Sequence, residues 1–109
     1  LALLNETQRV EMGRMLGQRL LREAKDDAGR LNRLFTLVAS RKPNAAERAA
    51  CMKLFDKLRQ RYAGNAKDAE AYLSIGDSPR DKKLNAADHA AWAQVAITVL
   101  ASDVALWVY

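Results

Sequence analysis

Few side chains in this sequence could carry out catalysis. His89 is the only histidine and Cys51 the only cysteine in 109 residues. A nucleophile needs a neighbouring base, and the base needs a group that orients it. Cys51 falls on the apolar face of a predicted helix, where burial raises the pKa of a thiol. His89 falls in the first turn of another, where the helix dipole disfavours a charged ring. We therefore predict a structural thiol, a surface or packing histidine and no catalytic residue.

Ligands for metals and cofactors are also missing from the sequence. One histidine and one cysteine cannot complete a tetrahedral zinc site, and there is no D-x-D-x-D-G run for calcium. There is no C-x-x-C-H haem attachment and no glycine-rich phosphate loop. Acidic and basic residues alternate along one loop, in the order Asp77, Arg80, Asp81, Lys82, Lys83 and Asp88. This alternation is typical of a solvated loop, so we expect no metal and no cofactor.

The elements that position these residues are predicted to be helices. Half of the residues are hydrophobic and only 6% are aromatic, so the core must consist mainly of alanine, leucine, valine and methionine. There are two prolines and no alternating run of β-branched residues. A chain of this length can bury one core. We predict one all-α domain over residues 1–109, a bundle of about five helices. Its abrupt Leu-Ala-Leu-Leu start suggests a piece cut from a larger protein, and no signal peptide is evident.

Capping signals divide the chain into five helices. Four predicted helices open with asparagine followed three residues later by an acid or glutamine, at Asn5, Asn44, Asn65 and Asn85. Asp26 or Asp27 is predicted to cap the remaining helix. The expected ends are near Ala24, Ser40, Tyr62 and Gly76, and a charged loop, Asp77 to Leu84, is expected to be the most mobile internal segment.

Apolar stripes on these helices predict the core. The predicted inward residues are Gly13, Leu16, Gly17, Leu20, Leu21 and Ala24, then Leu31, Leu34, Phe35 and Val38, then Cys51, Leu54, Phe55, Leu58 and Tyr62, and finally Ala69, Tyr72 and Leu73. Gly13 and Gly17 lie on one face, which predicts a close helix crossing. The arginines around these glycines are expected to flank the crossing; they are Arg9, Arg14, Arg19 and Arg22.

The last stretch, Asn85 to Tyr109, is the most apolar part of the chain. After His89 it holds one formal charge in twenty residues. A helix that is apolar on all sides is typical of the centre of a bundle. Ala90 to Tyr109 is also long enough to span a membrane, but polar residues interrupt it, at Gln94, Thr98, Ser102 and Asp103. We predict a central, buried helix without a membrane span, in which the first three of these residues bond to neighbouring backbone or meet solvent.

Asp103 lies on the same helical face as Trp92, and a lone buried carboxylate is costly. Two alternatives follow. Either the helix breaks at Ser102–Asp103 and Asp103 caps a final turn, or an arginine pairs with it, for which Arg41 is the candidate. The apolar end of the chain, Trp107 to Tyr109, would be a contact patch if exposed.

The net charge of +5 raises the question of an anionic partner. The basic residues are spread over three helices and the late loop, and acids are interleaved with them. A nucleic-acid reader would instead concentrate arginine, lysine and asparagine on one helix. We therefore expect no nucleic-acid partner.

The ordered set of short motifs resembles the C-terminal domain of unknown function of large secreted planctomycete proteins that often carry a cytochrome-c-like domain. The matching segments span the chain: the Leu1–Asn5 opening, Leu34–Phe35 with Ser40–Pro43, Gly76–Pro79, and Ala91–Trp92 with Val95, Ala96 and Leu100. Two positions depart from the family pattern. Ser40 stands where the family has glycine, and Asp103–Leu106 replaces an N-x-x-E-F-type ending.

The resemblance implies a secreted or cell-envelope parent protein, with any haem elsewhere in that parent, and it supplies no catalytic residue for this domain. Our first hypothesis is a non-catalytic structural or interaction module that binds its parent's remaining domains or a partner subunit. The alternative is one wall of an enzyme or redox site, which Arg41, Arg80 and His89 in one pocket would favour; the resemblance links such a site to polysaccharide. A third hypothesis is binding of an anionic polymer through the basic faces.

Overall fold

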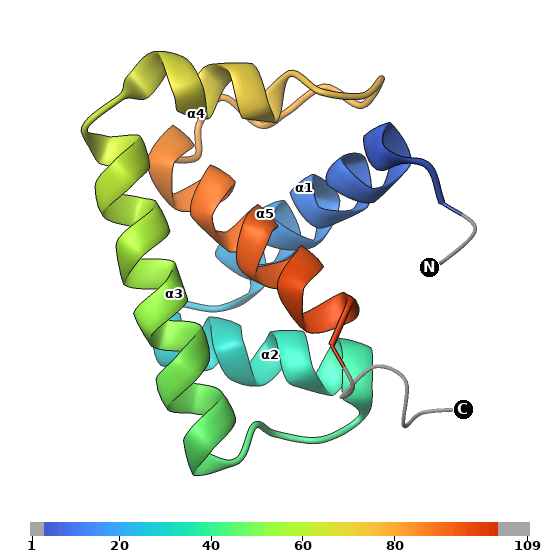
Figure 1. The fold of residues 1–109 in the computed structure, drawn as a ribbon, viewed down its shortest axis with the longest axis vertical. Coiled ribbons are helices and arrows are strands. Elements are labelled where there is room, and N and C mark those ends of the chain that lie inside the picture. The colour runs from blue at the N-terminus through green and yellow to red at the C-terminus, as the bar shows by residue number, and fades with distance from the viewer. Residues whose placement is uncertain (1–3, 103–109) are drawn as a thin grey trace.

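Five helices make up the part of the chain that the computed structural model describes, residues 4–102 (Figure 1). They are α1 (Glu6–Glu23), α2 (Asp27–Ala39), α3 (Ala45–Ala63), α4 (Ala66–Leu73) and α5 (Ala86–Leu100). Within residues 4–102 there is no strand. The prediction of an all-α bundle with five helices is therefore confirmed.

Side-chain caps set the start of every helix. The four predicted asparagine caps each accept a hydrogen bond from the backbone N–H three residues on. At Asn5 and Asn44 the capping box is complete, because Gln8 and Glu47 bond back to the backbone of the cap. Asp26 caps α2 by accepting from the N–H of Gly29 at 2.7 Å. Each cap satisfies one of the donors that the first turn leaves without a partner.

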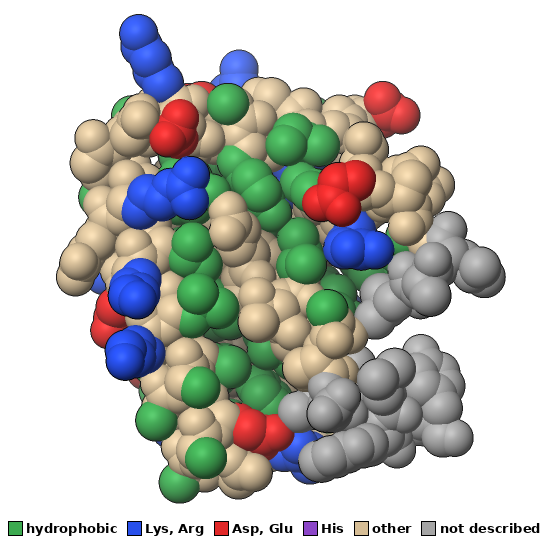
Figure 2. Space-filling view, in the orientation of Figure 1, with side chains coloured by type: hydrophobic (Ala, Val, Ile, Leu, Met, Phe, Trp, Pro, Cys, Tyr) green, Lys and Arg blue, Asp and Glu red, His purple; other side chains and the backbone are tan. Residues whose placement is uncertain are grey.

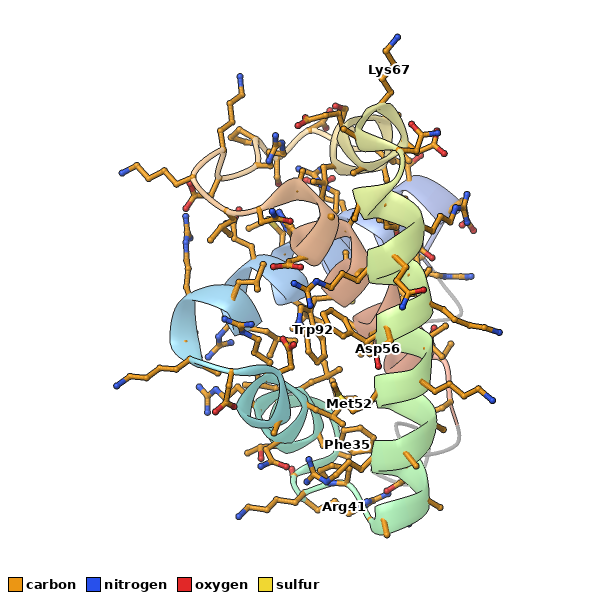
Figure 3. All side chains as sticks on the ribbon, turned by 90° about the vertical axis from the view of Figure 1, so that its left-hand side faces the viewer. Phe35, Arg41, Met52, Asp56, Lys67 and Trp92 are labelled. Atoms are coloured by element: carbon orange, nitrogen blue, oxygen red, sulfur yellow. The ribbon has the colours of Figure 1, made fainter. Side chains whose placement is uncertain are left out.

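The central element is α5, which packs against the other four helices (Figure 1). Its Trp92 side chain is fully buried and stacks on Phe55, with 4.5 Å between the ring centres. The indole N–H donates to the Asp27 carboxylate at 3.3 Å. Figure 3 shows Trp92 pointing into the space between α2 and α3. One edge of α5 is less enclosed, where Gln94 is half-buried and Thr98 is exposed.

Two glycines let α1 and α5 approach each other closely. A Cβ at Gly17 would lie 2.9 Å from the backbone nitrogen of Ala93. A Cβ at Gly13 would lie 2.7 Å from the carbonyl oxygen of Ala93 and 2.5 Å from the Ile97 side chain. Both glycines are buried. The predicted close crossing at this pair is therefore confirmed.

Two helix-level expectations need correction, on the end of α4 and on the burial of several core residues. α5 ends at Leu100, close to the break at Ser102–Asp103 that was one of our two alternatives. The Ser102 N–H bonds to the Val99 carbonyl three residues back, so the α-helical pattern does not continue there. Asp103 to Tyr109 lie outside the described residues. α4 ends at Leu73, three residues before Gly76. Several predicted core residues are only half-buried at the edge of the core; they are Leu16, Leu21, Ala24, Val38, Cys51, Leu54 and Tyr72.

No helix within residues 4–102 has both the length and the apolar character needed to cross a bilayer.

Candidate functional site

A stripe of polar residues on α1 binds the connection between α4 and α5, residues 74–85. The stripe residues follow one another at spacings of three and four, which places them on one side of the helix. They are Glu11, Arg14, Gln18 and Arg22, and we call them the α1 polar stripe. Each one hydrogen-bonds to the segment between Ile75 and Asp81. The stripe therefore fixes this loop, which runs out over α1 in Figure 1.

Glu11 binds the donors of the loop. Its carboxylate accepts the backbone N–H groups of Asp77 at 3.2 Å and Ser78 at 2.8 Å, and it also accepts the Ser78 hydroxyl. These bonds, first that of the hydroxyl, lower the pKa of Glu11. Gly76 has φ +93°, and a Cβ there would lie 2.5 Å from a Glu11 carboxylate oxygen. Both the left-handed backbone and the close carboxylate therefore require glycine.

Arg14 binds the acceptors of the same loop. One terminal nitrogen of its guanidinium donates to the Ile75 carbonyl, and the other donates to the Ser78 carbonyl at 2.6 Å. The side chain is 1% exposed and pairs with no carboxylate within residues 4–102. Burying a charge is costly unless it is hydrogen-bonded. Arg14 was expected to flank the helix crossing, and the structure shows that it is buried.

Gln18 and Arg22 continue the stripe to the end of the loop. The Gln18 carboxamide oxygen accepts the Asp81 N–H at 2.9 Å, and Arg22 pairs with the Asp81 carboxylate at 2.8 Å. The bond from Arg22 is the largest reason that the pKa of Asp81 is lowered. The predicted solvated loop is therefore bound to α1 along its inner side.

His89 lies beneath the stripe and is 1% exposed. Its Nε2 is 2.8 Å from the Arg14 carbonyl oxygen. A carbonyl only accepts, so Nε2 carries the proton. Burial lowers the pKa of His89, and the charges of Arg14 and Arg80 lower it further. The ring is buried and bonds to the backbone of α1, so His89 is a packing histidine, which is one of our two expectations.

Cys51 and the polar residues of α5 and its end, Gln94, Thr98 and Ser102, also have structural roles. Cys51 is half-buried, and burial raises the pKa of its thiol. Gln94 bonds to the Tyr62 hydroxyl, the Thr98 hydroxyl donates to the Gln94 carbonyl, and the Ser102 hydroxyl donates to the Val99 carbonyl. The expectation of bonds to neighbouring backbone is confirmed for Thr98 and Ser102.

Arg41 lies at the connection between α2 and α3, at the end of the molecule where Figure 3 labels it. Both of its terminal nitrogens donate to the Glu47 carboxylate at 2.8 Å. Glu47 also completes the Asn44 capping box. The predicted partner of Arg41, Asp103, lies outside the described residues. The structure therefore shows Arg41 closing the start of α3.

The Arg41–Glu47 pair predicts a pH dependence of stability. The bonds from Arg41, and then from Asn44, lower the pKa of Glu47 to about 2, from 4.5. A carboxyl group whose pKa is lower in the folded state stabilises the fold above pH 4.5 and loses this contribution as pH falls towards 2. We expect wild type to be more stable than Glu47→Gln at pH 7 and the difference to shrink between pH 5 and 2.5. Urea unfolding at several pH values measures this, and a constant difference would contradict it.

Two surface features adjoin the α1 polar stripe. The first is an apolar groove on the outer side of α1, which we call the methionine groove; it is lined by Met12, Met15, Leu16, Gln18, Arg19, Arg22 and Glu23. The second is a shallow depression, which we call the basic hollow; it is lined by Gln18, Arg22, Pro79, Arg80, Asp81, Lys82 and Lys83. Gln18 and Arg22 line both, so the two features are neighbours. The sequence analysis identified neither.

Comparisons with protein-family models, with curated proteins and with solved structures find no match for this chain. Within residues 4–102, no group of three or more histidine, cysteine or acidic side chains could hold a metal ion. The two surfaces beside the α1 polar stripe are therefore the candidate functional sites of the described residues.

Proposed function

We propose that this domain is a non-catalytic interaction module of a larger protein and that the methionine groove is its binding surface. The observation that carries the proposal is the position of the exposed large apolar side chains. Met12, Met15 and Ile75 are 36%, 43% and 37% exposed, and they lie on α1 or on the loop that α1 binds. Methionine is common at binding surfaces because its flexible thioether adapts to a partner.

The groove has the layout of a protein interface. Half-buried Leu16 lies with the two methionines in an apolar lining. Arg19 and Glu23 pair at 2.6 Å along its edge, and Arg22 is tied to Asp81. An apolar centre with a polar rim is typical of protein interfaces. Because the rim charges are already paired, a partner can bury the centre without leaving these charges unpaired.

A second apolar area is visible on the face that α3 and α5 form. Figure 2 shows small apolar side chains along this face, with lysine and arginine side chains at the outer edge of α3. A pocket where α3, α4 and α5 meet is lined by five alanines and Tyr62, together with polar Asn85 and the paired Arg59 and Asp88. Alanine offers little area to a partner compared with methionine. The methionine groove is therefore the better candidate.

The proposed partners are the remaining domains of the parent protein or a partner subunit. The resemblance supports a secreted or cell-envelope location. For the alternative of an enzyme wall, Arg41, Arg80 and His89 would have to face one pocket. Arg41 is engaged by Glu47 between α2 and α3, and His89 is buried beneath α1. This geometry favours binding over catalysis.

A pull-down tests the proposal, with the immobilised domain as bait and the separately expressed remainder of its parent protein as prey. We expect saturable association that weakens at least tenfold in the double variant Met12→Glu/Met15→Glu, because charge in an apolar interface centre costs more than about 1.4 kcal/mol. The matched control is Ala46→Glu/Ala49→Glu, at two exposed positions of α3 with the same spacing. Absent association, or equal loss in both variants, would refute the proposal.

A further inference from the structure

We propose that the basic hollow binds a phosphate group, either as the free anion or as a monoester. The methionine groove is apolar, whereas the basic hollow is lined mainly by cationic side chains, and this charge is the reason to expect an anion there. Four cationic side chains line it, from Arg22, Arg80, Lys82 and Lys83, against one carboxylate, that of Asp81. Glu70 pairs with Arg80 from outside the lining, so four positive and two negative charges leave a net charge of two positive.

The ion pairs around the hollow leave the two lysine side chains available to bind an anion. Asp81 is already bound to Arg22 at 2.8 Å and accepts the backbone N–H of Lys83 at 3.0 Å. Lys82 and Lys83 are exposed, and neither ammonium pairs with a carboxylate in the described part of the chain. Lys82 and Lys83 both line the hollow, and cations without counter-charges attract a dianion more strongly than a monoanion.

Two further donors are held in place around the hollow. The Arg80 side chain is 13% exposed, and its Nη2 forms an ion pair with the Glu70 carboxylate. Its Nη1 is buried and has no hydrogen-bond partner among residues 4–102. Gln18 is 7% exposed, and its carboxamide oxygen is occupied by the Asp81 N–H, so its NH2 group is left to donate. Glu70 takes one arm of the Arg80 guanidinium, so Arg80 adds its charge and its unpartnered Nη1, and the two lysines add point charges of the kind that commonly bind phosphate.

The hollow fits one anionic group and not an extended polymer. Its lining comes from one turn of the loop and one side of α1. Several basic side chains elsewhere are paired with acids, among them Arg19 with Glu23 and Arg59 with Asp88. Exposed lysines without an acidic partner among residues 4–102, such as Lys53 and Lys57, lie on α3, which does not line the hollow. A backbone-tracking polymer needs a continuous row of cations. We therefore assign the site to a single phosphate and not to a nucleic acid.

Titration with inorganic phosphate, followed by amide NMR at constant ionic strength against chloride, tests the assignment. We expect saturable shifts at Arg80 to Lys83 and a loss of affinity of at least tenfold in Lys82→Gln/Lys83→Gln. Both lysines are exposed, so this variant keeps the fold. The matched control is Lys53→Gln/Lys57→Gln, at two exposed positions of α3, which should bind as wild type does.

A second titration with glucose 6-phosphate distinguishes the two sources of the group. Tighter binding than that of inorganic phosphate identifies a monoester, and weaker binding identifies the free anion. Shifts that rise linearly without saturation, or equal affinities in the two lysine variants, would overturn the site. Met12→Gln/Met15→Gln, which adds no charge beside the hollow, should leave phosphate binding unchanged, so this result does not depend on the methionine groove.

Discussion

Replacing Arg14 by methionine is expected to lower the free energy of unfolding by about 3 kcal/mol. Methionine fills much of the same space but cannot donate to the carbonyl groups of Ile75 and Ser78. Two acceptors then remain without their charged donor in a poorly hydrated position. For a domain of this size the melting temperature should fall by roughly 15 °C.

Thermal and urea unfolding of Arg14→Met measure this loss. The control is Arg19→Met on the same helix, where the exposed pair with Glu23 is worth about 0.5 kcal/mol or less. Hydrogen exchange of the amides of Asp77, Ser78 and Asp81 should also become faster, because the loop loses its attachment to α1. Equal stabilities of the two variants would show that Arg14 does not hold the loop.

The double substitution Gly13→Ala/Gly17→Ala is expected to destabilise the domain by about 3 kcal/mol. Helix propensity alone predicts the opposite sign, a gain of about 1 kcal/mol for each glycine replaced. Packing decides the sign of the stability change. The new Cβ atoms would lie 2.7 and 2.9 Å from backbone atoms of Ala93, which cannot move aside as a flexible side chain can. α1 and α5 must therefore separate.

Gly64→Ala is the matched control for the predicted sign of the stability change. Gly64 has φ −80°, and a Cβ there would lie no closer than 3.5 Å to its nearest neighbour. Its replacement should leave the stability unchanged or raise it by up to about 1 kcal/mol. If the double variant were also stabilised, the close crossing of α1 and α5 would be wrong.

Local signals made the helices predictable. An asparagine followed three residues later by an acid or glutamine predicts both the start of a helix and the hydrogen bonds that form there. The apolar stripes identified the core because helical periodicity is read along one element. The end of α5 was predictable only as one of two alternatives, since its apolar pattern continues beyond Leu100.

The α1 polar stripe was missed for a physical reason. A row of glutamate, arginine and glutamine along a helix normally faces solvent, and only a tertiary contact can bury it. Arg14 is buried because a loop 61 to 64 residues away supplies two carbonyl groups. A signal was nevertheless present. Arg14 directly follows Gly13, on the side of α1 that the glycine pair already assigned to a helix crossing.

The central claim is that partners bind the methionine groove, and photo-crosslinking tests it most directly. A photo-reactive amino acid is placed at Met15 in one sample and at Ala63, beside the α3–α5 face, in another. Each is then illuminated with the remainder of the parent protein. The structure predicts a crosslinked product from position 15 and none from position 63. A product from position 63 alone would contradict the claim and move the binding surface to α3 and α5.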